Sequence, residues 1–277
     1  MMKKILLITL LIFTACQNKN SQGQPNRKIE KEFYENEKSE YKITYHKNGY
    51  DSVIYKYRNG EIYKTGKLRN KNKYGNWFIY DSLKDLRQIR EFVIVNNSTY
   101  LNRVFHLKNG DTLAKKYDLI TAQQEFAGDT LNFNNTTYNF IKVLSSDTIS
   151  INEPFAAYAL SGSPTMRNLN SQVIVLVGKE KNNFNSDFSN LKEVKLDTFY
   201  NANIDTINQK NFPGYNWNYV VAFGKYFGTS GKKTIKGYIL EYAESPFKDS
   251  LLINQNIDSL TTKTYFEKVI FVRENRQ

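Results

Sequence analysis

The chain has 277 residues, a formal net charge of +12 and one cysteine. A single cysteine excludes an intrachain disulfide and a cysteine-rich metal site. The length allows two modest domains or one large β domain, and an aromatic content of 14% can supply a packed core.

The N-terminus has the order of a bacterial export signal. A basic start is followed by an apolar run over residues 5–13, which is too short for a membrane-spanning helix of about 20 residues. The run ends in Phe-Thr-Ala-Cys at 13–16, which resembles a lipobox, where signal peptidase cleaves before a cysteine that is then diacylated. We therefore predict a signal peptide over 1–15 and a lipid on Cys16 that anchors the protein to a membrane.

A polar segment follows the predicted anchor. Residues 17–27 read QNKNSQGQPNR and cannot bury enough apolar surface to order themselves. We predict a flexible tether over 16–30. Surface lipoproteins of the Bacteroidetes type often carry acidic residues directly after the cysteine, whereas residues 17–20 contain none. This difference favours the outer membrane, facing the periplasm, over the cell surface.

The positive charge is concentrated in the first half. Residues 17–120 hold 21 Lys and Arg against 12 Asp and Glu, a balance of +9, whereas residues 121–277 hold 16 against 15, a balance of +1. A basic surface attracts anionic partners, and export argues against nucleic acid. We expect a protein partner, with an acidic protein as one candidate, although a solvated basic face is the simpler interpretation of the charge.

Residues 40–119 alternate apolar and polar side chains between three Asn-Gly pairs. These pairs are Asn48-Gly49, Asn59-Gly60 and Asn109-Gly110. Period-two alternation indicates strands, and Asn-Gly between strands is typical of the type I′ hairpin turn, in which both central residues have positive φ. The pattern predicts an antiparallel meander sheet over 31–120.

One segment of this meander, residues 57–81, resembles a MORN-type repeat, in the variant found in bacterial proteins often labelled as antitoxins. The match departs from the repeat at Glu61, where Lys is usual, and in an irregular spacer. The resemblance implies an elongated antiparallel sheet that serves as a binding or scaffolding surface, and it implies no catalytic residues. The matching positions are Asn59, Gly60, Gly66, Gly75, Trp77 and Tyr80.

Four aromatic residues are candidates for partner binding. Tyr74, Trp77 and Tyr80 belong to the repeat-like segment, and Trp217 lies in the second half. Aromatic residues are also ordinary strand residues. We therefore favour a structural role, with Trp77 buried and the tyrosines covering the other face of the sheet.

The second half, residues 128–277, has several short apolar strands separated by turn-forming clusters, a pattern typical of a β-sandwich. A short helix is expected over 186–191, and Gly237 within a strand predicts a bulge or a close backbone approach. The stretch 231–241 resembles a strand of Bacteroidetes lipoproteins with Ig-like domains. The fold class is therefore predicted as all-β with at most one short helix. Strands are expected over 148–160, 172–177, 219–227, 234–242 and 264–272.

Catalytic and metal-binding motifs are missing from the sequence. His46 and His106 are the two histidines, and neither has a second ligand at metal-binding spacing. The segment 228–231 satisfies neither the nucleophile elbow nor the phosphate loop. We predict no catalytic residue, cofactor or metal, although a carboxylate pair could assemble only in the fold.

These features favour a non-enzymatic lipoprotein that acts as a binding or scaffolding module in the cell envelope. One alternative is a periplasmic immunity or antitoxin-like protein that masks a toxin. A second alternative is a glycan-processing enzyme. Burial of Trp77 and Trp217 would weaken the idea of a glycan ligand, since sugars stack on exposed aromatic rings.

Overall fold

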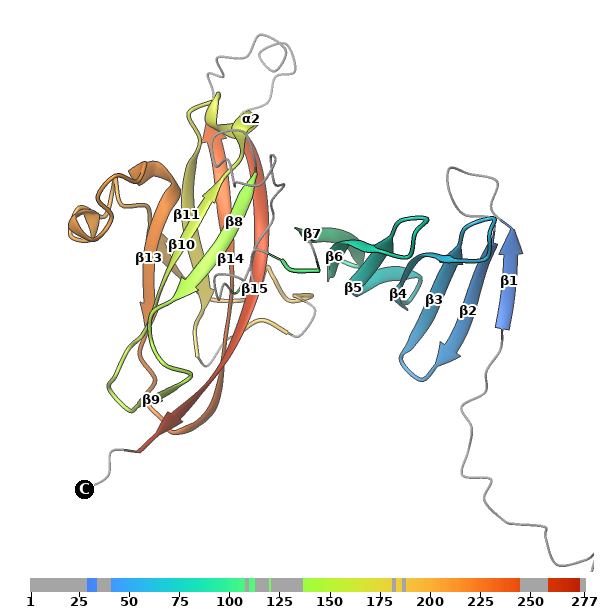
Figure 1. The fold of residues 1–277 in the computed structure, drawn as a ribbon. Helices are drawn as coiled ribbons and strands as arrows, with labels where there is room; N and C mark the ends of the chain where they lie inside the picture. The colour runs from blue at the N-terminus through green and yellow to red at the C-terminus, as the bar shows by residue number, and fades with distance from the viewer. Residues whose placement is uncertain are drawn as a thin grey trace, which may run out of the picture.

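The computed structural model describes residues 29–33, 41–107, 110–112, 120, 137–180, 183–185, 188–244 and 259–274. The described part is all-β, as predicted, with antiparallel sheets and one short α-helix (Figure 1). The predicted signal peptide, Cys16, the tether up to residue 28 and nearly all of the predicted domain boundary near residues 118–130 lie outside the described residues.

The first half forms one seven-stranded antiparallel sheet in which each strand pairs with the next strand of the chain. This order confirms the predicted meander, because alternating strands joined by tight turns can pair only with their neighbours. The strands are β1 (Ile29–Phe33), β2 (Tyr41–Lys47), β3 (Tyr50–Lys56), β4 (Ile62–Arg69), β5 (Asn72–Tyr80), β6 (Leu86–Val95) and β7 (Ser98–His106).

The turn at Asn59-Gly60 differs from the predicted type I′. Only Gly60 has a positive φ, of 85°. Its N–H donates to the carbonyl of Tyr57 at 2.9 Å, and the Tyr57 N–H donates to the carbonyl of Glu61 at 2.8 Å. This geometry is a type I turn followed by a left-handed glycine, which closes the hairpin through a bulge.

Two other hairpins use the type I′ conformation without glycine. Between β4 and β5, Asn70 and Lys71 have φ of 49° and 66°, and between β6 and β7, Asn96 and Asn97 have φ of 50° and 61°. Asparagine tolerates positive φ better than most residues, whereas Lys71 has no such preference. These turns lack the Asn-Gly pair, and the sequence therefore did not predict them.

A small aromatic core holds the middle of the seven-stranded sheet. Trp77 is buried together with Val53 and Phe92 on one face, and its Nε1 donates to the carbonyl of Lys67 at 3.2 Å. The indole lies over Gly66, where a Cβ atom would overlap the ring. The predicted burial of Trp77 is confirmed, and its partner is a glycine that leaves room for it.

The second half is a two-layer sandwich. A three-stranded sheet in the order β13-β10-β8 faces a five-stranded sheet in the order β12-β11-β14-β15-β9. The strands are β8 (Tyr138–Val143), β9 (Thr148–Ser150), β10 (Phe155–Gly162), β11 (Gln172–Gly178), β12 (Leu196–Tyr200), β13 (Val220–Lys225), β14 (Gly231–Glu244) and β15 (Ser259–Arg273). β9 pairs with the end of β15 in parallel, and the other pairs are antiparallel.

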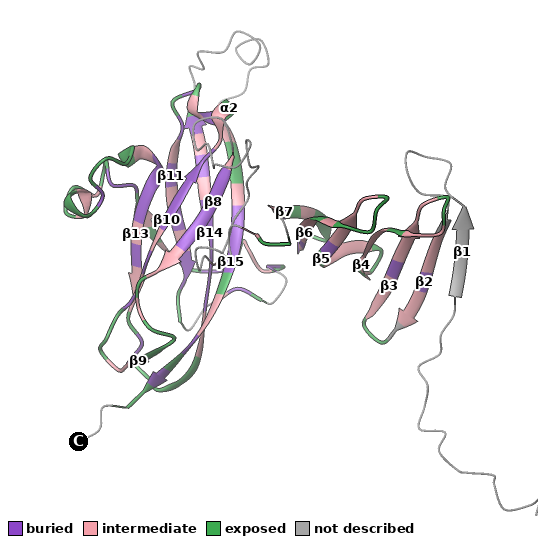
Figure 2. Cartoon of the chain, viewed as in Figure 1, coloured by how far each residue is buried: buried purple, intermediate pink, exposed green. Residues whose placement is uncertain are grey.

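Many of the buried residues lie on the strands of these two sheets (Figure 2), and their apolar side chains pack together as one core. Inward positions of β11 alternate with half-buried ones, as a strand with one covered face requires, whereas the middle of β14 is buried at five successive positions. Gly237 is one inward position, and a Cβ there would overlap the carbonyl oxygen of Leu176 on β11. The close backbone approach predicted for this glycine is confirmed, and its register with β15 contains no bulge.

Several predicted boundaries of strands and helices were wrong. The strand expected over 148–160 is split by a turn at Asn152, which has a φ of 70°. The described part of the expected helix, residues 188–191, is turn rather than helix. The short α-helix of the described part is instead α2 (Pro164–Arg167), which begins at a proline. Two 3-10 turns, η1 (Gln209–Asn211) and η2 (Trp217–Tyr219), follow β12.

The seven-stranded sheet docks against the edge of β15 through side chains of β7. The hydroxyl of Tyr100 donates to the carbonyl of Lys263 at 2.6 Å and accepts its N–H at 3.3 Å. The amide of buried Asn102 donates to the carbonyl of Tyr265 at 2.9 Å and accepts its N–H at 2.6 Å. Two side chains thus satisfy a strand edge that would otherwise expose unpaired main-chain groups.

Candidate functional site

The four predicted partner-binding aromatics do not form one site. Trp77 is buried in the seven-stranded sheet, and Trp217 is 39% exposed on η2 of the sandwich. Tyr74 pairs with Lys67 and lies on the face opposite Trp77, since the two residues are an odd number of positions apart in β5. The arrangement supports the structural interpretation of Trp77.

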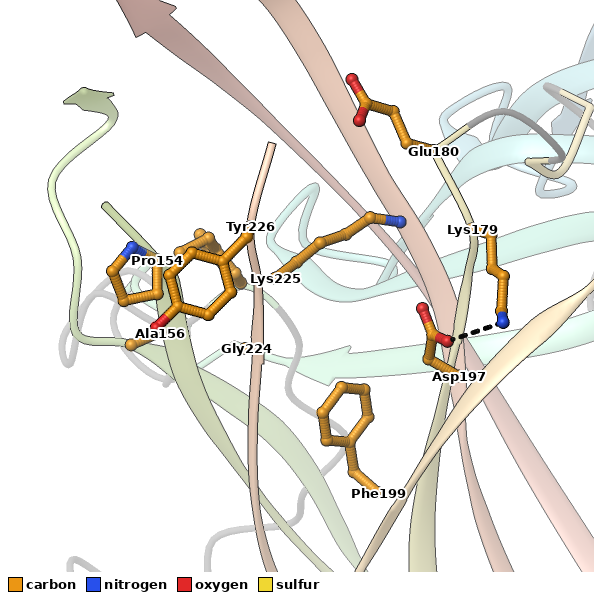
Figure 3. Close-up of a pocket in the computed structure, with 10 residues that line it drawn as sticks. Pro154, Ala156, Lys179, Glu180, Asp197, Phe199, Gly224, Lys225 and Tyr226 are labelled. Carbon is orange, nitrogen blue, oxygen red and sulfur yellow. Dashed lines mark ion pairs between the residues drawn. The ribbon is translucent and has the colours of Figure 1, made fainter. Parts of the chain in front are cut away.

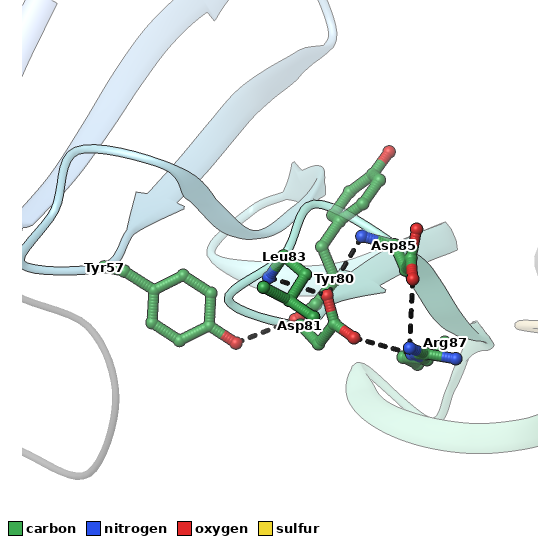
Figure 4. Close-up of polar contacts among 6 residues, drawn as sticks. All are labelled: Tyr57, Tyr80, Asp81, Leu83, Asp85 and Arg87. Carbon is green, nitrogen blue, oxygen red and sulfur yellow. Dashed lines mark hydrogen bonds and ion pairs between the residues drawn. The ribbon is translucent and has the colours of Figure 1, made fainter.

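Tyr80 begins a tight turn rather than a binding surface (Figure 4). Its carbonyl accepts the hydroxyl of Tyr57 at 2.8 Å. The next residue, Asp81, accepts the N–H groups of Leu83 and Asp85 and the Arg87 Nε, at 2.9, 3.0 and 2.7 Å. The Arg87 guanidinium lowers the pKa of the Asp81 carboxyl. These contacts fix the β5–β6 connection.

A cleft of about 650 Å³ lies at one margin of the sandwich, where the outermost strands of the two sheets, β12 and β13, meet. Figure 3 shows the Lys225 side chain extending towards Glu180, whereas the ring of Tyr226 lies beside Pro154. Tyr226 is 67% exposed. The lining residues are Pro154, Phe155, Ala156, Lys179, Glu180, Asp197, Phe199, Gly224, Lys225 and Tyr226.

Two contacts bridge the sheets at opposite ends of this margin. At one end, the N–H of Ala202, just after β12, donates to the carbonyl of Val220 at 2.9 Å. At the other end, Lys225 Nζ on β13 donates to the carbonyl of Gly178 on β11. Between these contacts, the inward side chain of Phe199 forms part of the cleft wall.

The charged groups of the cleft balance one another. Lys179 pairs with Asp197 at 3.4 Å, and Glu180 pairs with Lys233 at 2.7 Å. The hydrogen bond from Lys233 lowers the pKa of the Glu180 carboxyl, and burial lowers the pKa of the Lys225 ammonium. Two cations and two anions line the cleft, so its chemistry suits a ligand of low net charge with both apolar and polar groups.

Sequence reasoning missed this cleft entirely. Its charged residues directly follow β11 or lie at the ends of β12 and β13, and none belongs to a motif. The strand β12 itself was not predicted, because Leu196–Tyr200 is short and follows a turn-rich segment. The alternation of Leu196, Thr198 and Tyr200 with Asp197 and Phe199 was the one available signal.

A second polar cluster surrounds a buried carboxylate. Glu241 on β14 is 2% exposed, and its carboxylate accepts the Ser171 hydroxyl at 2.8 Å and the Ser163 N–H at 3.2 Å. Arg167 lies between the rings of Tyr138 and Tyr219, with its guanidinium carbon 4.8 and 5.0 Å from their centres. Burial raises the pKa of the Glu241 carboxyl.

The histidines have local partners in the seven-stranded sheet. His46 Nδ1 lies 2.8 Å from Asp51, and His106 Nδ1 lies 3.3 Å from the amide of Gln88. Within the described ranges, no group of three or more His, Cys, Asp and Glu side chains is placed to hold a metal ion.

Comparison of the chain with protein-family models, with curated proteins and with solved structures finds no match. Among the described residues, none of the helices has the length and apolar character needed to cross a membrane.

Proposed function

We propose that this protein is a non-enzymatic lipoprotein of the cell envelope that binds a protein partner. The observation that supports this proposal is the cleft between β12 and β13, which combines an exposed tyrosine with apolar walls and balanced charges. Protein interfaces favour such exposed aromatic side chains at their centres. The junction at Tyr100 and Asn102 ties this sandwich to the sheet that follows the tether.

The anchor is tested separately from the partner. Wild-type protein and Cys16→Ser are labelled with radioactive palmitate in cells. We expect label on the wild type only, because the lipobox-like sequence offers one acceptor cysteine. Stable anchoring needs more than one acyl chain, and the variant has no cysteine that could carry them. We therefore expect the variant to leave the membrane fraction. Equal labelling of both proteins would contradict the anchor.

Binding at the cleft is tested by photocrosslinking in cells. A photoreactive phenylalanine replaces Tyr226, and a matched control carries it at Leu83, which is 77% exposed on the β5–β6 turn. We expect a discrete crosslinked species from position 226 that is absent from position 83. A position 226 variant that is expressed and anchored but forms no crosslink would contradict a protein partner at the cleft.

The charge of the seven-stranded sheet favours a second candidate, the immunity or antitoxin-like protein. Residues 41–107 hold 13 Lys and Arg against 5 Asp and Glu, a balance of +8. Each of these five acids already contacts a basic side chain or a histidine within the sheet. The β4–β5 hairpin carries Lys67, Arg69, Lys71 and Lys73 without an acid, which suits an acidic protein.

This candidate predicts a protective role. A strain that lacks the protein is grown in competition with its parent. If the protein masks a toxin that the parent secretes, we expect the parent to kill the deletion strain. Protection should return with the wild-type gene and not with Lys67→Glu/Arg69→Glu, whereas Lys84→Glu at the opposite end of the sheet serves as control. Equal survival of deletion strain and parent would contradict this role.

A further inference from the structure

The smaller sheet of the sandwich ends in a strand with an open side. β13 pairs with β10 on one side, and the three-stranded sheet has no further strand beyond it in the described part of the chain. The five-stranded sheet continues past this margin, because β13 lies against both β11 and β12. A fourth strand of the smaller sheet would therefore lie beside β13 and across from β12, whose inward Phe199 ring lies 6.0 Å from the ring of Phe223 on β13.

The direction of the main-chain groups on this open side follows from one hydrogen bond. The carbonyl of Val220 accepts the N–H of Ala202, which lies on the side away from β10. Main-chain groups of a strand alternate sides with a period of two. Ala222 and Gly224 therefore present their N–H and C=O groups to the same open side, and no described residue hydrogen-bonds to them there.

Residues on both sides of β13 line the cleft. Ala156, Gly224 and Tyr226 line it from the outer side, whereas Phe199 and Asp197 line it from between the sheets (Figure 3). A strand placed beside β13 would direct alternate side chains to these two sides. Gly224 has no side chain that could obstruct an incoming strand. A Cβ atom at this position would also lie too close to the carbonyl oxygen of Phe155.

From this geometry we infer that the cleft receives an extended peptide strand of a partner protein, which pairs with Ala222 and Gly224 of β13. The inference rests on the proposed binding function and specifies how the partner is held. Main-chain hydrogen bonds would supply affinity, and alternate side chains would supply selectivity. The balanced charges of Lys179, Asp197, Glu180 and Lys225 suit a segment that alternates apolar and polar residues with little net charge.

Hydrogen exchange tests whether this position is open in the isolated protein. Amide exchange of lipid-free protein from Gln17 onward is followed by NMR. We expect rapid exchange at Ala222 and Gly224 and slow exchange at Val221 and Phe223, which pair with β10. Slow exchange at all four amides would mean that the chain itself fills the position, and this result would overturn the inference.

Peptide binding tests the occupant. The probe is a panel of ten-residue peptides that alternate Val or Phe with Thr, Lys or Glu, used at up to millimolar concentration. We expect at least one peptide to slow exchange at Ala222 and Gly224. Its analogue, N-methylated at alternate residues on the pairing side, should lose this effect, because each methyl group removes a donor and blocks pairing.

Two variants complete the test. Ala222→Pro removes the N–H on the open side, where an edge strand tolerates proline, and should weaken binding by about tenfold or more. Ala222→Ser keeps the N–H and should bind like the wild type. Failure of every peptide to protect the two amides would overturn strand addition. A partner crosslink at position 226 that Ala222→Pro does not affect would also overturn it, while leaving the proposed binding function intact.

Discussion

The side-chain amide of Asn102 satisfies both main-chain polar groups of Tyr265, as a neighbouring strand residue would. Tyr100 does the same for Lys263, two residues earlier in β15. This part of the outer side of β15 is thereby covered without a strand, whereas β9 covers its end. An exposed edge of this kind would be a template for association with other chains, so this junction both joins the two halves and protects the sandwich.

Asn102→Ala should destabilise the protein by about 1–3 kcal/mol, because it leaves the N–H and C=O of Tyr265 without partners at a buried position. Urea unfolding of the lipid-free protein from Gln17 onward measures the effect. Asn76→Ala, at an exposed position of β5, is the matched control and should unfold near the wild-type midpoint. Equal stability of both variants would show that the junction contributes nothing to folding.

Gly66→Ala should lower stability by about 1–3 kcal/mol, because the added Cβ overlaps the indole of Trp77 and forces the ring from its buried position. A shift of tryptophan fluorescence should accompany the loss. Gly228→Ala has free space around the added carbon and an unstrained backbone, and should be close to wild type. An unshifted spectrum and midpoint for Gly66→Ala would mean that the indole does not pack on this glycine.

Gly60→Val tests a different glycine, whose role is conformational. No atom lies near its added Cβ, but its φ of 85° strains a β-branched residue, at a cost of about 1–3 kcal/mol. Gly60→Asn should lose less, since asparagine tolerates this region. The change should also disturb the rings of Tyr57 and Tyr63, whose centres are 5.1 Å apart across the hairpin. Identical urea midpoints for Gly60→Val and the wild type would contradict this turn.

Glu241 makes the stability of the sandwich depend on pH. Its folded-state pKa is raised above the ordinary value near 4.5 by burial, so the folded state holds the proton more tightly than the unfolded state. Stability is therefore lost as pH rises from about 4.5 through the folded-state pKa. Glu241→Gln removes this titration and keeps an acceptor for Ser171. Its stability relative to wild type should increase between pH 4 and neutrality, whereas a constant difference would contradict the raised pKa.

The sequence predicted elements whose signals are local. Alternation along β2 to β7 identified the meander, and the mid-strand Gly237 correctly indicated a close backbone approach. The turn types were harder to predict from the sequence, because Asn-Gly fits both the predicted type I′ turn and the type I turn with a glycine bulge. Which of these forms is decided by the register of the flanking strands rather than by the dipeptide.

The candidate site could not be predicted from local signals at all. Asp197 and Lys225 are 28 positions apart in the chain, and they share a cleft only because β12 and β13 are the outermost strands of facing sheets. Strand order in a sandwich depends on long-range pairing, which alternation does not encode. Trp77 illustrates the opposite case, since its burial was predicted from local sequence, as an aromatic residue within an alternating strand.

The consecutive strand order of the first sheet has a mechanical consequence. Six inter-strand steps of about 4.8 Å separate β1 from β7, a span of roughly 29 Å, and β7 is the strand fixed to the sandwich. If Cys16 carries the lipid, the sheet is a spacer whose width sets the distance between the cleft and the end of the tether. Each hairpin inserted or removed would change that reach by close to 10 Å without altering the chemistry at either end.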